Sequence, residues 1–125
     1  MTVATTTTRV LYDSLRSSNA TGVRAGLATG RTLVFWGMEL TVDVVIHTTE
    51  SEWGYVYGQV IRHADGSAVN DVEVSLDGGE PVRTDECGQF AIATRDPRLA
   101  KELRVHMPVD AVTFTIPPWD RRELR

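Results

Sequence analysis

Cysteine is almost absent from this sequence of 125 residues, in which Cys87 is the single example. One cysteine excludes a disulfide within the chain and a thiolate metal cluster built by one chain. Long apolar runs are also absent. The strongest runs, residues 33–36 and 42–46, are far shorter than the roughly 20 residues that a membrane-spanning helix needs. We therefore expect no membrane partner.

An excess of charge of one sign is absent as well. The chain has 13 Lys and Arg against 17 Asp and Glu, a formal net charge of -4, which gives no electrostatic reason to expect a nucleic acid partner. Residues 1–10 lack the charged leader and the apolar stretch of a secretory signal, so we expect a cytoplasmic protein. The remaining composition, 42% hydrophobic and 24% charged, is typical of one globular domain.

Residues 1–31 differ in composition from the rest of the chain. They are rich in threonine, serine and glycine and poor in large apolar side chains, which predicts an N-terminal tail and loop segment. Within this segment, residues 10–15 contain Leu11 and Leu15 at helical spacing, but the stretch is too short to distinguish a helix from a strand. We expect it to dock on the domain that follows.

From residue 32 onward the apolar residues recur with a period of two. The clearest case is the run 40–47, in which Leu40, Val42, Val44 and Ile46 share one face of a half-buried strand. Further runs rich in Val, Ile, Thr and aromatic residues are separated by turn-forming clusters: 32–36, 55–62, 72–76, 81–84, 89–94, 103–107 and 112–116.

Seven or eight short strands at this spacing predict an all-β fold, a single antiparallel β-sandwich over residues 32–118. Residues 96–103 predict a short helix or a turn, because Pro97 suits a first helical turn. Pro117 and Pro118 should end the last strand, which leaves 119–125 as a C-terminal tail.

Four short motifs between residues 55 and 116 follow one another in a recognisable order. They are Gly58-Gln59-Val60, the turn Asp65-Gly66, the Val-x-Val-x-Leu strand of 72–76 and the Thr-Asp-x-x-Gly-x-Phe hairpin of 84–90. This order resembles the carboxypeptidase regulatory-like, or transthyretin-like, β-sandwich domain. Each motif also has a physical reading. A glycine in a strand suits a crowded place in a sheet, and an Asp-x-x-Gly turn supplies a cap and a positive φ.

A second resemblance includes residues farther upstream. The runs 31–35 and 40–44, together with 58–60 and 83–90, are similar to short bacterial proteins encoded beside alternative sigma factors and caspase-like CHAT proteins, although that family usually carries a longer helical N-terminus. This resemblance implies an adaptor, regulator or protease target in a stress or defence pathway, without activity of its own. It implies a CHAT-type protease or a sigma-factor pathway component as the partner. Cleavage is then expected in the tails 1–9 and 120–125 or in the 16–31 loop.

The residues that could carry chemistry are scattered along the chain. His47, His63 and His106 have no metal-binding spacing, and Cys87 lies in a hairpin turn without an adjacent base, so we assign no metal, no cofactor and no catalytic residue. The chain is therefore expected not to be an enzyme.

The candidate binding residues come from the outward side of the strands. If Val56, Gly58 and Val60 face the core, then Tyr55, Tyr57 and Ile61 share the opposite face, beside outward Val45. Such a face needs cover. We expect residues 10–15 or 117–119 to fold over it; otherwise a partner protein or a second copy binds there. The predicted partner-binding set is Tyr55, Tyr57, Ile61, Val45, Leu11, Leu15 and Trp119. The alternative function is a carbohydrate-type ligand module that stacks sugars on Trp36, Trp53 or Trp119.

Overall fold

The fold is built from β-strands throughout the described part of the chain. The computed structural model describes residues 8–15 and 30–119, and none of these residues is helical. None of the described segments forms a helix with the length and apolar character needed to cross a bilayer. The strands are β1 (Thr8–Asp13), β2 (Gly30–Gly37), β3 (Leu40–Thr48), β4 (Trp53–Arg62), β5 (Glu73–Leu76), β6 (Val82–Arg83), β7 (Gln89–Arg95), β8 (Lys101–His106) and β9 (Ala111–Ile116).

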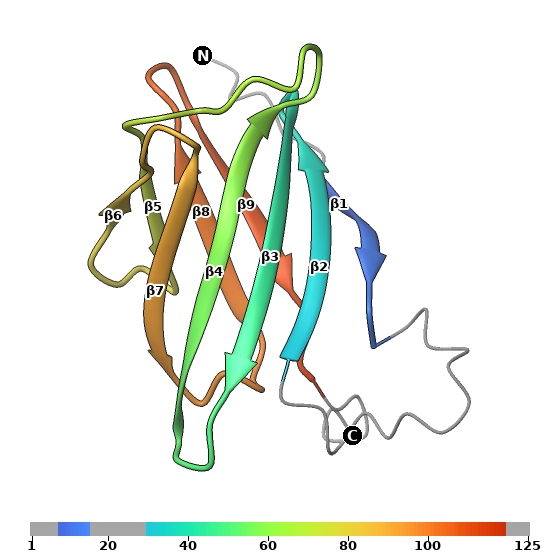
Figure 1. Ribbon diagram of the computed structural model, residues 1–125, viewed down its shortest axis with the longest axis vertical. Helices are drawn as coiled ribbons and strands as arrows, with labels where there is room; N and C mark the ends of the chain where they lie inside the picture. Colours follow the sequence, from blue (N-terminus) through green and yellow to red (C-terminus); the bar gives the residue numbers. More distant parts are fainter. Residues whose placement is uncertain (1–7, 16–29, 120–125) are drawn as a thin grey trace, which may run out of the picture.

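These strands form two antiparallel sheets that pack face to face. One sheet has five strands in the order β1-β2-β3-β4-β7 and the other has four in the order β6-β5-β8-β9 (Figure 1). The prediction of an all-β sandwich is therefore confirmed. The predicted runs correspond to β2 to β9, and the additional strand is β1, which lies where the sequence left helix and strand open.

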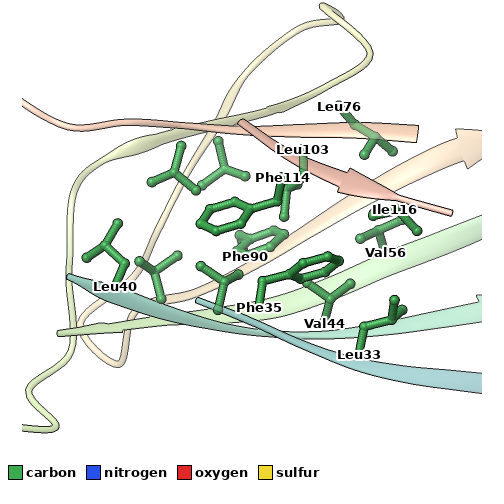
Figure 2. Close-up of a cluster of buried hydrophobic side chains, with 14 of the residues drawn as sticks. Leu33, Phe35, Leu40, Val44, Val56, Leu76, Phe90, Leu103, Phe114 and Ile116 are labelled. Carbon is green, nitrogen blue, oxygen red and sulfur yellow. The ribbon is translucent and has the colours of Figure 1, made fainter. Parts of the chain in front are cut away.

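The core lies between the two sheets and is apolar on both sides. Every second residue of β2, β3, β8 and β9 is buried there, and in β4 the same alternation buries Gly54, Val56 and Val60. Three phenylalanine rings from different strands, Phe35, Phe90 and Phe114, gather at its centre (Figure 2). The ring centroids of Phe35 and Phe114 are 5.5 Å apart.

Three of the motif residues, Gly58, Asp85 and Gly88, have the roles that the sequence predicts. The ring of Phe90 lies over Gly58, where a Cβ atom would overlap it. In the turn before β7, the Asp85 carboxylate accepts hydrogen bonds from the backbone N–H groups of Cys87 and Gln89, both at 2.9 Å. Gly88 has a φ of 77° in that turn, a conformation that favours glycine. This hairpin holds the end of β7 against β4, because Gln59 also donates to the carbonyl oxygen of Cys87 at 2.8 Å.

A buried ion pair joins the N-terminal strand to the C-terminal end of the sandwich. Arg31 Nη2 lies 2.6 Å from Asp13 Oδ2, and Arg31 Nη1 donates to the carbonyl oxygen of Pro117 at 2.7 Å. Trp119 packs beside this pair with only 5% of its surface exposed. Both segments predicted to be tails therefore contribute ordered residues to the fold, and residues 96–99 form a turn, not a helix.

Candidate functional site

The two sheets present outer faces of very different chemistry. The outer face of the four-stranded sheet is polar, as expected for a face in contact with water. It carries Glu73, Ser75, Glu102, Arg104, His106, Thr113 and Thr115. The outer face of the five-stranded sheet carries aromatic and aliphatic side chains at the corresponding positions.

We call this second surface the aromatic face. It consists of the outward side chains of β2, β3, β4 and β7: Thr32, Val34, Trp36, Thr41, Asp43, Val45, His47, Trp53, Tyr55, Tyr57, Gln59, Ile61, Gln89, Ala91, Ala93 and Arg95. Four large members remain open to solvent: Val45 is 42% exposed, Trp53 46%, Tyr55 41% and Tyr57 44%. Exposed apolar groups that adjoin one another in this way mark interaction surfaces more often than isolated ones do.

The register of the strands fixes the centre of the aromatic face. Tyr57 lies opposite Val45 on one side and Ala91 on the other. Tyr55 lies one step along β4, opposite His47 and Ala93. The two tyrosine rings stack with centroids 5.9 Å apart, which holds them in a fixed relative orientation. The centre is thus a stacked aromatic pair with Val45 and His47 on one side and Ala91 and Ala93 on the other.

A shallow groove of about 580 Å³ runs across one half of this face. It is lined by Asp43, Val45, Tyr57 and Ala91 of the aromatic face and, from β6 and the connection to β7, by Arg83 and Asp85. The groove is therefore wide enough to take a large side chain, with an apolar floor and a carboxylate at one end.

Two titratable residues of the aromatic face have no partner within the described part of the chain. The side chains of Asp43 and His47 make no hydrogen bond or ion pair with any other described residue. They lie on either side of Val45 along β3. In contrast, Arg95 at the far end is engaged, because it lies 3.3 Å from Glu52 and its Cζ is 5.4 Å from the centroid of the Trp53 ring.

The structure brings together four of the predicted binding residues on the aromatic face and places the other three elsewhere. Tyr55, Tyr57 and Val45 form the centre of the aromatic face. Ile61 shares that face, farther along β4 and opposite Thr41, and is partly buried. Leu11 is exposed on the edge strand β1, at a bulge in its pairing with β2.

The expectation that the chain's own segments cover the aromatic face is wrong for the described residues. Residues 10–13 extend the sheet as β1, because their backbone pairs with β2 at its edge. Leu15, just after β1, packs against the core. Trp119 is held at the end of the sandwich. Its backbone N–H donates to the carbonyl oxygen of Arg98 at 2.7 Å, and its ring lies beside Arg31. Of the predicted cleavage regions 1–9, 16–31 and 120–125, residues 8–9 lie in β1 and residues 30–31 in β2, and the rest lie outside the described residues.

Sequence reasoning named Trp53 only as a candidate for sugar stacking, and it did not single out Asp43 or His47 as members of this face. The signal was present, because Asp43 and His47 alternate with core residues in the same strand as Val45, and Trp53 has the same parity as Tyr55. What the sequence could not provide was the register that places β3 beside β4.

The three tryptophans do not form a common platform. Trp119 is buried at the end of the sandwich. Trp36 and Trp53 lie at opposite ends of the aromatic face, about 27 Å apart by the rise of a β-strand. Arg9 lies over the Trp36 ring, with its Cζ 5.5 Å from the centroid, as Arg95 lies over Trp53. A sugar chain that stacks on several of them together is therefore poorly accommodated.

Other polar groups offer little convergent chemistry. Ser75 Oγ lies 3.5 Å from His106 Nε2, which is long for a nucleophile and its base. Among the described residues, no three His, Cys, Asp or Glu side chains gather closely enough to hold a metal ion. Cys87 is exposed in its turn.

No protein-family model, curated protein or solved structure matches this chain. Nothing in these comparisons identifies the carboxypeptidase regulatory-like family or the sigma-factor and CHAT neighbours, so both resemblances stay predictions. The aromatic face is the feature of the molecule from which a function can be inferred.

Proposed function

We propose that this protein is a non-catalytic protein–protein interaction module whose binding element is the aromatic face. The observation that carries the proposal is the contrast between the two outer faces of one sandwich. The same fold keeps polar residues on the outer side of β5, β8 and β9, yet exposes Trp53, Tyr55 and Tyr57 along β4. Tyrosine and tryptophan are the residues most enriched at the energetic centre of protein interfaces.

The surroundings of these aromatic residues also favour a protein as the bound species. Val45, Tyr57 and Ala91 form an apolar centre, and the polar side chains of Asp43 and Gln59 lie one step from it along β3 and β4. An apolar centre with a polar border is the usual anatomy of a protein interface. Sugar recognition instead needs open aromatic rings among convergent polar groups, and the ring of Trp53 is partly occupied by Arg95.

The place of the module in a cell belongs to the same proposal. We propose a role as adaptor, regulator or protease target in a bacterial stress or defence pathway, with a CHAT-type protease or a sigma-factor pathway component as partner. This part is supported by the sequence resemblance alone. It is separable from the interaction itself, since the aromatic face can be tested without knowing the pathway.

A site-specific photo-crosslinker tests whether the aromatic face engages a protein. The crosslinking amino acid p-benzoylphenylalanine would replace Tyr57 in one variant and Arg104, on the polar outer face, in a matched control. Irradiation in the native cells should yield an adduct of defined mass from position 57 and none from position 104. Val45→Asp, which places a charge beside position 57, should abolish the adduct.

Two results would overturn the proposed function. The first is the absence of any adduct from position 57. The second is the same adducts from positions 57 and 104, because this would show that the contacts are not specific to the aromatic face. Circular dichroism of each variant verifies that it is folded.

A further inference from the structure

We propose that the occupant of the aromatic face is a second copy of this chain, packed face to face about a two-fold axis. The inference rests on the proposed function and names the partner of that same site. The axis follows the row formed by Val45, Tyr57 and Ala91, which lie directly opposite one another on β3, β4 and β7. A rotation about this row reverses the strand direction and sets each strand over its own counterpart.

The outward residues of β3 are complementary to themselves under this rotation. Asp43 and His47 lie at equal distances from Val45, one on each side. The rotation therefore places Asp43 of each copy opposite His47 of the second copy. A carboxylate and an imidazole attract each other as an ion pair or a hydrogen bond. Since neither group has a partner among the described residues, each gains in the dimer the interaction that the single chain lacks.

The outward residues of β4 follow the same symmetry about Tyr57. Trp53 comes to lie opposite Ile61 of the second copy, which joins two apolar side chains. Tyr55 comes to lie opposite Gln59, whose amide carbonyl can accept a hydrogen bond from a phenol. The Gln59 amide nitrogen is already engaged with the carbonyl oxygen of Cys87, so its oxygen is the group directed to a new donor. Two neighbouring strands thus specify the same axis independently.

Other two-fold axes in the plane of the sheet are less favourable. An axis parallel to the strands and centred on β3 would place Asp43 against its own copy, with two like charges face to face. The same axis between β3 and β4 would place Asp43 against Gln59 and leave His47 against Tyr55. Of these axes, the one along the row of Val45 and Tyr57 places the Asp43 carboxylate of each copy opposite the His47 imidazole of the other.

The size of the aromatic face also suits a stable dimer. The four strands of this face, about 4.8 Å apart and about 30 Å long, give a flat footprint of about 580 Å², which the projecting side chains enlarge. A standard interface buries about 800 Å² on each partner. When the two faces pack together, they form a further sandwich layer in which the sheets lie about 10 Å apart and their strands are nearly aligned. Two-fold symmetric dimers are the commonest assemblies of identical chains.

Sedimentation equilibrium of the purified chain tests the inference. A reductant is included because Cys87 is exposed and could otherwise link two chains. The mass should rise with concentration from 13.8 kDa toward twice that value. His47→Glu sets carboxylates against each other at two symmetric places, and we expect the dimer Kd to rise about 100-fold. Asp43→Lys should weaken the dimer in the same way.

A charge exchange and a matched control separate this pairing from general damage. The double variant Asp43→Lys/His47→Glu restores opposite charges, and its Kd should return to within about 10-fold of the original value. Glu102→Lys and His106→Glu make comparable changes on the polar outer face and should leave the Kd unchanged. A double variant no better than the single ones, or an equal loss from the control changes, would overturn the inference.

The failure of this inference can be distinguished from failure of the proposed function. A mass of 13.8 kDa at every concentration overturns the second copy as occupant. The proposed function then still stands if position 57 crosslinks to a different protein. If the chain dimerises only after residues 16–29 are replaced by a glycine–serine linker, then that segment of the same chain competes for the aromatic face, and the inference fails for the intact protein.

Discussion

The buried ion pair between Asp13 and Arg31 gives a sharp prediction about stability. Both side chains are only 2% exposed, and the two groups share two hydrogen bonds, at 3.1 Å and 2.6 Å. Asp13→Asn keeps the shape of the side chain but leaves the Arg31 guanidinium buried without a counter-charge. Removal of one partner from a buried pair lowers the free energy of unfolding by about 3–5 kcal/mol.

This loss is large against the total stability of a domain, which is about 5–15 kcal/mol. With an m-value of about 1.5–2 kcal/mol/M in urea, the unfolding midpoint should fall by about 2 M. Urea unfolding followed by tryptophan fluorescence measures it, since Trp119 lies beside Arg31. A matched control is Asp71→Asn, because Asp71 pairs with Arg83 at the surface, where the two side chains are 79% and 60% exposed, respectively. Exposed pairs contribute about 0–1 kcal/mol.

The double replacement of Asp13 by Leu and Arg31 by Met examines the cause. It removes both charges together, so most of the loss should be recovered, because apolar replacement of a buried pair is often neutral or stabilising. The reasoning is refuted if Asp13→Asn costs no more than Asp71→Asn.

Two further predictions concern the turn and core motifs. Gly58→Ala forces a methyl group into the ring of Phe90 and to 2.9 Å from the carbonyl oxygen of Asp43. The free energy of unfolding, measured in urea, should therefore fall by about 1–3 kcal/mol. An unchanged urea midpoint would contradict the close packing of Phe90 on Gly58. The side-chain hydrogen bond from Ser67, followed by its backbone hydrogen bond, lowers the pKa of Asp65. A lowered pKa stabilises the fold above the unfolded pKa, and this contribution is lost as the pH falls through the folded pKa. Ser67→Ala should raise the Asp65 pKa in an NMR titration of its carboxyl carbon, and a pKa that stays in place would show that the hydroxyl is not the cause.

The strands could be predicted because their apolar residues alternate. In β3 and β4 the alternation alone decides which residues face the core, and Tyr55 and Tyr57 could be assigned to the outer face for that reason. The strand β1 could not be distinguished from a helix, since its pairing with β2 depends on a contact distant in sequence. Trp119 was assigned to a tail because it follows two prolines, whereas its position is determined by Arg31 and Arg98, which lie far from it in the chain.

The outward residues of the two sheets differ, although both sheets belong to the same sandwich. The sandwich needs its inward residues, but the polar outer face of the four-stranded sheet demonstrates that a sheet of this molecule is stable with Glu73, Arg104 and Thr113 toward solvent. Nothing in the packing of the core therefore requires Tyr57 or Val45 on the outer side of the other sheet. A cross-strand pair on such a face, like Tyr57 with Val45, adds only about 0.2–1 kcal/mol to stability, whereas exposed apolar groups raise the risk of nonspecific association. This imbalance is the reason that we propose a surface buried in an assembly.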